Sequence, residues 1–325
     1  MRMNDRISQV IQAVQDAHRD GMLIDLKLYG ATGGKVIGVL QRLMQLLPEN
    51  ECYVEIGVFQ GMSLLSTAKA APGIKAFGID DFSQFDKDGK NRQLIEERKI
   101  KAGINNAFLI NMDFEDALND LGRHLNGRKI GLFFIDGPHD YRSQIVCFLL
   151  AKKYLSEEAI ILVDNSNYNH VRQANQDFLM SHPEYKMIFE AYSRSHPANL
   201  KGAELDEAWK GWLDGINIIV RDPQDRLRPM YPETIRDRSL FFNDHKIHPM
   251  RNSELAWRAA KLAAVLKPFR PYYFFGFLYK LIVEVRKRKR SEIQPFLFIN
   301  SYSENLPKFN LNKSAQEIEN RSVKI

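Results

Sequence analysis

A strand, a glycine turn, a helix and a second strand follow one another between Cys52 and Asp81. The first apolar run ends in Val-Glu-Ile-Gly, and Gly57 and Gly61 bracket the turn that follows it. Leucine and alanine residues then recur at helical spacing over residues 62–71, before a second short apolar run. This order predicts a β-α-β unit. Its glycine turn would let a ligand approach the backbone, because glycine has no Cβ atom to block the way.

The residues around this turn indicate the kind of ligand. Glu55, Gly57 and Gly61 form the pattern E-x-G-x-x-x-G, whereas a dinucleotide fingerprint has a glycine in the place of the acid. Glu55 would repel a pyrophosphate but suits a ligand that carries an ammonium group. Asp80 follows the second strand, where an acid can accept hydrogen bonds from both ribose hydroxyls. S-adenosylmethionine has the ammonium, a sulfonium and the ribose, and has no phosphate. The unit therefore predicts an S-adenosylmethionine site and disfavours a nicotinamide enzyme.

The chain continues with apolar runs that alternate with helical patterns. Three such runs, at residues 107–112, 129–135 and 159–163, are each followed by an aspartate. Uninterrupted apolar runs between helices are typical of a parallel sheet that is buried on both faces. The runs at 185–192 and 215–221 have no crossover pattern between them, which predicts an antiparallel hairpin at the edge of the sheet.

Three parts are expected along the 325 residues. Residues 1–50 form an N-terminal helical cap, in which the glycine turn at 30–34 is read as a helix connector in preference to a loop over the ligand. Residues 51–222 form the ligand-binding core. Residues 223–325 form a partly helical, basic extension, with a helix over 253–267 and a polar, partly disordered end.

Charge and cysteine content indicate which partners and which cellular compartment to expect. Five of the positive charges behind the net charge of +6 lie in the single run 286–290, so the charge says little about the substrate of the core. The aromatic-basic run 272–290 could contact an anionic membrane surface or another subunit, and a solvated tail is the alternative. Cys52 and Cys147 lie in apolar runs without metal-binding spacing, which predicts reduced thiols in a cytoplasmic protein. No apolar run reaches the ~20 residues that span a bilayer.

Five motifs together resemble the class I S-adenosylmethionine-dependent methyltransferases: VEIGVFQG, GIDD, NMDFEDAL, FFIDGPHDY and ILVDNSN. The last two resemble more narrowly the metal-dependent O-methyltransferases of the catechol and macrolide-sugar types. The resemblance covers roughly residues 20–222. It implies an α/β fold with a doubly wound, mostly parallel seven-stranded sheet, N-terminal helices and a helical C-terminal extension.

The resemblance also implies roles for the residues that bind the cofactor. Glu55 and Gly57 would hold the methionine end of S-adenosylmethionine, and Gly61 would let the chain turn past it. Asp80 would bind the ribose hydroxyls, in preference to Asp81. Asp113, after the third strand, would lie near the adenine amino group.

Three residues at the ends of the fourth and fifth strands form the expected metal site. In the catechol-type enzymes, an aspartate and an Asp-Asn pair bind magnesium at these places, where this chain has Asp136, Asp164 and Asn165. The carboxyl ends of adjacent parallel strands lie together, and two carboxylates with an amide oxygen suit Mg²⁺ or another divalent cation. The alternative is that these residues only cap helices.

His139, three residues after Asp136, is the candidate catalytic base. The catechol type has a lysine there, and a free imidazole with a pKa near 6.5 can accept a proton at neutral pH. A loop histidine bonded to the backbone is the alternative. Tyr168, Asn169 and His170 would line the acceptor pocket or decorate the start of a helix.

The expected function is metal-assisted methyl transfer to a hydroxyl of a small molecule or sugar. Specific nucleic-acid binding is not expected, because residues 136–139 read Asp-Gly-Pro-His in place of the Asn/Asp-Pro-Pro-aromatic motif of adenine N-methylation. A nucleic-acid methyltransferase and a non-catalytic protein that retains the fold remain the alternatives. Assembly into a homo-oligomer is left open.

Overall fold

The computed structural model describes residues 6–86, 88–236, 261 and 305–323. The chain divides into two compact units, Met1–Ile235 with Phe298–Ile325, and Arg236–Leu297. The helix expected over 253–267 lies outside the described residues apart from Lys261, and the aromatic-basic run 272–290 lies outside them entirely. The account below concerns the first unit.

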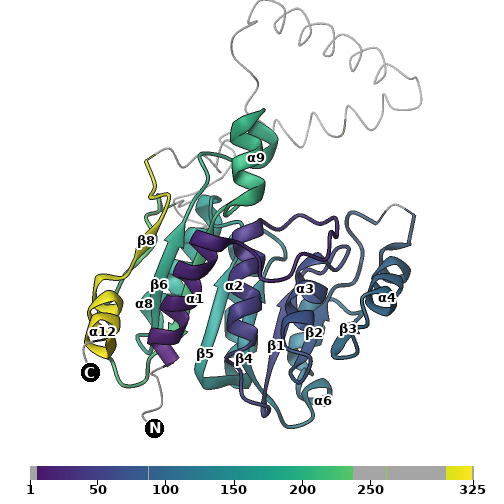
Figure 1. Cartoon of the computed structure of the whole chain (residues 1–325), viewed down its shortest axis with the longest axis horizontal. Helices are drawn as coiled ribbons and strands as arrows, with labels where there is room; N and C mark the ends of the chain where they lie inside the picture. The colour runs from purple at the N-terminus through teal and green to yellow at the C-terminus, as the bar shows by residue number, and fades with distance from the viewer. Residues whose placement is uncertain (1–5, 87, 237–260, 262–304, 324–325) are drawn as a thin grey trace, which may run out of the picture. The chain divides into compact units, whose positions relative to one another are not determined.

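One mixed sheet forms the centre of this unit (Figure 1). Its strands, in chain order, are β1 (Glu51–Ile56), β2 (Lys75–Ile79), β3 (Ala107–Ile110), β4 (Lys129–Ile135), β5 (Leu155–Val163), β6 (Tyr185–Ala191), β7 (Ile216–Arg221) and β8 (Asn310–Leu311). The spatial order is β3-β2-β1-β4-β5-β7-β6-β8. β1 to β5 are parallel, and β7 runs antiparallel between β5 and β6. The doubly wound fold and the antiparallel hairpin are confirmed, with β8 as an eighth strand.

The strand order reverses at β1, and this is where such a sheet forms a crevice. The chain moves outward from β1 through β2 and β3, then returns to pair β4 with the other side of β1. The connections after β1 and β4 therefore leave in opposite directions. In open α/β sheets, ligands bind outside the carboxyl ends of the strands at this reversal.

Helices cover both faces of the sheet because the buried strands present apolar side chains to either side. On one face pack α1 (Arg6–Asp20), α2 (Gly34–Met44), α3 (Met62–Ala70), α4 (Asn91–Lys101) through Ile95, and α12 (Lys313–Val323). On the other pack α5 (Phe114–Asn119), α6 (Gly122–Leu125), α7 (Tyr141–Ala151) and α8 (Asn169–Ser181). Within the described part of the chain, no helix is both long and apolar enough to cross a membrane.

The C-terminal segment returns to the core. β8 pairs antiparallel with β6, and Asn312 donates from Nδ2 to the carbonyls of Met187 at 3.0 Å and Arg228 at 2.9 Å. α12 then packs against α1. β8 thereby covers backbone groups that β6 would otherwise expose at the edge of the sheet.

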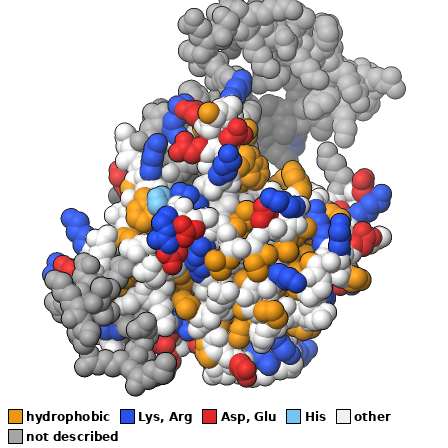
Figure 2. All heavy atoms as spheres, viewed as in Figure 1, with side chains coloured by type: hydrophobic (Ala, Val, Ile, Leu, Met, Phe, Trp, Pro, Cys, Tyr) orange, Lys and Arg blue, Asp and Glu red, His pale blue; other side chains and the backbone are white. Residues whose placement is uncertain are grey.

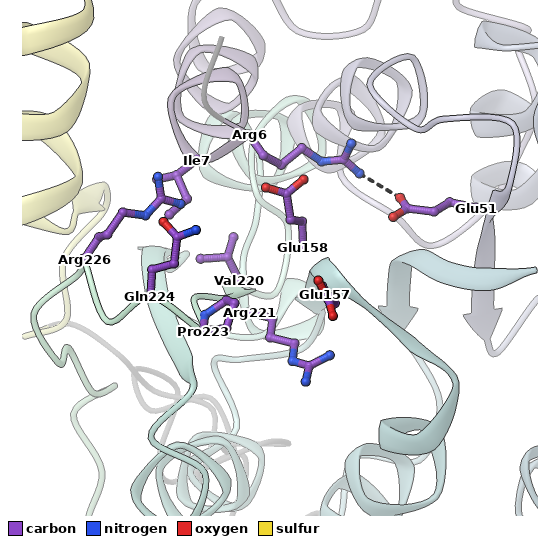
Figure 3. A pocket seen from close by; sticks show the side chains of 10 residues that line it. All are labelled: Arg6, Ile7, Glu51, Glu157, Glu158, Val220, Arg221, Pro223, Gln224 and Arg226. Atoms are coloured by element: carbon purple, nitrogen blue, oxygen red, sulfur yellow. Dashed lines mark hydrogen bonds and ion pairs between the residues drawn. The ribbon is translucent and has the colours of Figure 1, made fainter. Parts of the chain in front are cut away.

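A pocket of about 230 Å³ lies at the amino ends of the parallel strands (Figure 3). It is lined by Arg6, Ile7, Glu51, Glu157, Glu158, Val220, Arg221, Pro223, Gln224 and Arg226. Arg6 forms an ion pair of 3.0 Å with Glu51, and the lining holds equal numbers of arginines and glutamates. Because these opposite charges balance, the lining favours neither anionic nor cationic ligands. Its position, at the edge opposite the carboxyl ends of the strands, separates this pocket from the site described next.

Candidate active site

The glycine turn after β1 is shaped by contacts within the protein. Gly57 and Gly61 have φ angles of 86° and 80°, in the left-handed region that favours glycine. A Cβ atom on Gly57 would lie 2.1 Å from the carbonyl oxygen of Asp136. The missing side chain therefore lets the loop after β4 approach the end of β1. The same turn holds Phe59 at a φ of 50°, which is strained for an aromatic residue.

Asp80 ties this turn to the loop after β2. Its Oδ2 accepts hydrogen bonds from the backbone N–H groups of Val58 and Phe59, both at 2.8 Å, and its Oδ1 accepts one from Phe82 at 2.8 Å. A carboxylate offers about four acceptor positions, so Oδ1 retains capacity for a ribose hydroxyl. The neighbouring Asp81 is exposed and bonds only to Ser83 among the hydrogen bonds described for it.

Glu55 is fully buried on β1 and faces the start of α3. It accepts hydrogen bonds from the Tyr53 hydroxyl, from Ser63 Oγ at 3.1 Å and from the Leu64 backbone. The bond from Leu64 satisfies a backbone N–H of the first helical turn, which lacks a partner inside the helix. Burial raises the pKa of Glu55 to about 8, although the three hydrogen bonds favour the charged form.

The raised pKa of Glu55 predicts how stability depends on pH. Between the ordinary value of 4.5 and the folded value of about 8, the native state holds a proton that the unfolded state releases. The free energy of unfolding should therefore fall as pH rises through this range, by at most about 1.4 kcal/mol per pH unit for this group. Glu55→Gln should flatten the slope. Urea unfolding of both proteins at several pH values checks this, and equal slopes would contradict it.

Asp113 follows β3 and caps α5. Its carboxylate accepts a hydrogen bond of 2.8 Å from the backbone N–H of Glu115, and its side chain is exposed. The structure thus gives Asp113 a capping role at the carboxyl edge of the sheet. A contact with adenine stays a prediction.

The predicted metal residues meet at the carboxyl ends of β4 and β5. Asp136 keeps a partly exposed surface, but burial of its carboxyl group and the nearby Asp164 and Glu55 raise its pKa well above its usual range. Burial raises the pKa of Asp164 to about 7, with bonds to the Asn165 backbone and the Asp136 carboxyl group limiting the rise. Neighbouring carboxylates repel one another in a buried site, so this pair favours a proton or a cation between them.

The donor atoms fit a hard cation. One carboxylate oxygen of Asp164 and the amide oxygen of Asn165 are buried without a hydrogen-bond partner. Buried polar atoms are seldom left unpaired, and oxygen donors of this kind suit Mg²⁺ or Ca²⁺. Among the described residues, no three His, Cys, Asp or Glu side chains are grouped to hold a metal ion. The predicted set has two carboxylates and an amide, and would leave further positions to water and substrate.

His139 lies beside this cluster, next to the rings of Tyr168 and His196. Its ring centroid is 5.2 Å from that of Tyr168, which in turn is 6.0 Å from that of His196. His139 is an exposed residue, but desolvation of its ring, followed by the neighbouring His196, lowers the pKa of His139 to about 4. The imidazole is therefore neutral at physiological pH and can accept a proton. Contact with Asn165 opposes the lowering.

Of the residues expected at the acceptor pocket, Tyr168 lies beside His139, whereas Asn169 binds the segment at 234–235. Asn169 bonds through Oδ1 to the Ile235 N–H at 2.8 Å and through Nδ2 to the Ile235 carbonyl at 2.7 Å. Thr234 also donates to Asn169 Oδ1 at 2.8 Å. Asn169 thus clamps the segment at 234–235 onto the start of α8. His170 is partly buried in the first turn of the same helix.

Sequence reasoning missed three residues of the site, Thr32, His196 and Asp214. The glycine turn at 30–34 was read as a connector, but its Thr32 is 4% exposed and hydrogen-bonds Asp136. A Cβ atom on Gly33 would lie 2.5 Å from the Gly211 carbonyl oxygen, which explains the glycine. Asp214 lies just before β7, which runs antiparallel to β5. The start of an antiparallel strand lies at the same edge of the sheet as the carboxyl ends of the parallel strands. An acid just before the predicted antiparallel strand was therefore the signal that could have placed Asp214 at the site.

Comparison with known families agrees with the topology and the motifs. Residues 54–166 match a family model described as "Methyltransferase domain". Residues 54–166 are a methyltransferase domain. The fold around it is that of the class I, S-adenosylmethionine-dependent enzymes. The matched segment contains the residues predicted to bind the cofactor and the metal and to act as the base. The acceptor-pocket candidates Tyr168, Asn169 and His170 lie outside it, as do Thr32, His196 and Asp214.

Several solved structures are similar to the chain. An O-methyltransferase from Bacillus cereus in complex with SAH has 15% identity, with 68% of this chain and 93% of that chain covered and a TM-score of 0.44. The O-methyltransferase TomG from Streptomyces achromogenes, involved in tomaymycin synthesis and in complex with SAM, has 17% identity, 68% and 91% coverage and a TM-score of 0.44. An rRNA methylase from Streptococcus thermophilus has 11% identity, 57% and 95% coverage and a TM-score of 0.38. No curated protein matches the chain.

Proposed function

We propose that this protein is an S-adenosylmethionine-dependent O-methyltransferase that acts, with a divalent cation, on a hydroxyl of a small molecule or sugar. The observation that carries the proposal is the meeting of Asp136, Asp164 and Asn165 beside the neutral His139 at the carboxyl edge of the sheet. Unpaired oxygen donors next to a proton acceptor suit the activation of a hydroxyl group.

Each part of the site has a role in this proposal. The β1–α3 turn, held by Asp80 and Glu55, would bind the cofactor, and Asp136, Asp164 and Asn165 would hold the cation. A bound Mg²⁺ would supply positive charge that lowers the pKa of the acceptor hydroxyl. His139 would take the proton of that hydroxyl, and the Tyr168 ring would restrict water on one side. Positioning of the acceptor oxygen by these groups would provide most of the rate enhancement.

Two observations support the proposed partners and cellular location. The described Lys and Arg side chains on the face in Figure 2 are interspersed with Asp and Glu, so that face offers no basic stripe to a nucleic acid. Cys52 and Cys147 are free and buried, which supports a reducing, cytoplasmic setting. We propose no specific nucleic-acid partner. For the aromatic-basic run 272–290, which lies outside the described residues, a solvated tail and contact with a membrane surface stay alternatives, and homo-oligomer formation stays open.

Binding of S-adenosylhomocysteine tests the cofactor assignment. The ligand should raise the melting temperature, because at 100 times its Kd it adds about 2.7 kcal/mol to the stability of the native state. NAD should produce no shift. Asp80→Ala should remove the response, because it deletes the ribose acceptor and releases the Val58 and Phe59 N–H groups.

Asp81→Ala is the matched control, since Asp81 is the adjacent acid but bonds to Ser83 alone among its described contacts. Thermal shift and calorimetric titration of the three proteins measure the effect. Stabilisation by NAD without stabilisation by S-adenosylhomocysteine would reject the assignment.

A further inference from the structure

Asp214 is a buried carboxylate that the proposed chemistry leaves unused. It is 2% exposed, and neither of its oxygens has a hydrogen bond of standard geometry. Burial and the nearby Asp164 raise its pKa well above the usual range, and contact with the Asn165 side chain opposes that rise. An unpaired carboxylate in the interior is costly, so its retention beside the cluster calls for a functional reason.

Backbone contacts bring Asp214 to this place. The N–H of Asn167 donates to the Asp214 carbonyl at 2.9 Å, and the N–H of Ser166 donates to the Gly215 carbonyl at 3.2 Å. Gly215 has a φ of 83°, and a Cβ atom there would lie 2.5 Å from Asn167 Oδ1. The glycine therefore lets the segment before β7 lie directly against the loop that carries Asn165.

His196 supports Asp214 from the other side. Its Nδ1 accepts a hydrogen bond of 3.0 Å from the Ala198 N–H, so a neutral ring carries its proton on Nε2. That Nε2 lies 3.8 Å from Asp214 Oδ2. With Nδ1 occupied and Nε2 turned to Asp214, His196 is placed to orient the carboxylate and is not placed as the base.

Asn165 stands between two groups. Its side chain contacts Asp214 and His139, while its amide oxygen is buried without a hydrogen-bond partner. Asn165 also has a φ of 55°, a left-handed conformation that its neighbours must hold. A side-chain amide whose nitrogen contacts one partner presents its oxygen on the opposite side.

We propose that Asp214, steadied by His196, is the positioning residue that holds the Asn165 amide so that its oxygen faces the cation. Asp214 is not itself a ligand in this arrangement, because no three carboxylates or histidines of the described residues are grouped around one metal position. Partners that orient a metal ligand typically contribute 10- to 100-fold to metal affinity. The inference rests on the proposed function, since it requires a divalent cation at Asp136, Asp164 and Asn165.

Mn²⁺ is the probe, because the electron paramagnetic resonance signal of the free ion reports binding without any turnover. The full-length wild type should bind Mn²⁺, and Asp214→Ala should weaken binding by about 10- to 100-fold. Asp214→Asn retains an acceptor oxygen and should give an intermediate affinity, which also covers the case in which the alanine variant does not fold. Affinity for S-adenosylhomocysteine should be unchanged in both variants.

The matched control is Asp222→Asn at the other end of β7. Asp222 is 1% exposed and accepts a hydrogen bond from the Leu227 N–H at 2.8 Å, so its loss should lower the melting temperature and leave Mn²⁺ affinity intact. Wild-type affinity in both Asp214 variants would overturn the positioning role alone. If Asp222→Asn weakened Mn²⁺ binding equally, the positioning role would also be overturned, because the loss would then come from a general disturbance of β7. A wild type that binds no Mn²⁺ would instead reject the metal in the proposed function, and the inference with it.

Discussion

Replacing Asp164 with alanine is expected to abolish methyl transfer and to leave the binding of S-adenosylhomocysteine largely intact. Asp164 is 3% exposed and brings a buried oxygen without a hydrogen bond to the proposed cation site, so its loss removes one of the two proposed carboxylate ligands. A cation stabilises a reacting oxygen by several kcal/mol, which corresponds to a rate loss of about 10³-fold or more. The proposed cofactor contacts at Asp80 and the β1–α3 turn lie on other loops.

Chelation should reproduce this result in the wild type. EDTA should stop methyl transfer, and added Mg²⁺ should restore it in the wild type but not in Asp164→Ala. The metal-free variant should be no less stable than the metal-free wild type, because it removes one of the carboxyl groups that repel each other in the buried cluster. Activity assays, calorimetry and melting curves give the three readouts. Full activity in EDTA would assign Asp136, Asp164 and Asn165 to structural roles.

Replacing His139 with alanine is expected to lower kcat by about 10²- to 10⁴-fold with little change in cofactor affinity. The surroundings lower the pKa of His139 to about 4, so the ring is deprotonated over the whole range from pH 6 to 8. The plot of wild-type rate against pH should therefore show no inflection from His139 near pH 6.5, the ordinary pKa of histidine. In the variant, hydroxide can take the proton, and the rate should rise with pH until part of the loss is recovered.

His182→Ala is the matched control for this experiment. His182 follows α8 at the end remote from the site, where its ring stacks on Phe178 at 4.5 Å. It should lose stability and keep the wild-type profile of rate against pH. If His139→Ala behaves in the same way, His139 is a structural residue. If the variant keeps most of its rate at neutral pH, the cation alone activates the acceptor.

Much of the candidate site could be predicted because its residues follow parallel strands. Asp80, Asp136 and Asp164 each come directly after an apolar run, and the carboxyl ends of neighbouring parallel strands meet at one edge. Local pattern therefore determines both the strand and the place of the residue after it. The antiparallel pairing of β6 with β7 also agreed with the prediction, which rested on the polar segment between them having no clear crossover pattern. In the structure that segment forms η2 (Pro197–Asn199) and α9 (Ala203–Lys210).

Other features depend on which segments meet in space. Asp214 reaches the cluster because β7 inserts between β5 and β6, and Thr32 reaches Asp136 because the turn before α2 packs against Gly211. β8 joins β6 across more than a hundred residues of chain, a pairing for which its two-residue strand carries no periodic signal.

The sequence by itself thus determined the β-α-β core and the residues that follow its parallel strands, because apolar periodicity and strand polarity are local properties. Only the tertiary structure decided which distant loops close the site, and it also gave Gly57 and Asp80 their contacts within the protein. The physical reason is that such contacts are made by backbone approach and single buried hydrogen bonds. These leave no repeating pattern in the chain, and their partners are set by the packing of the whole sheet.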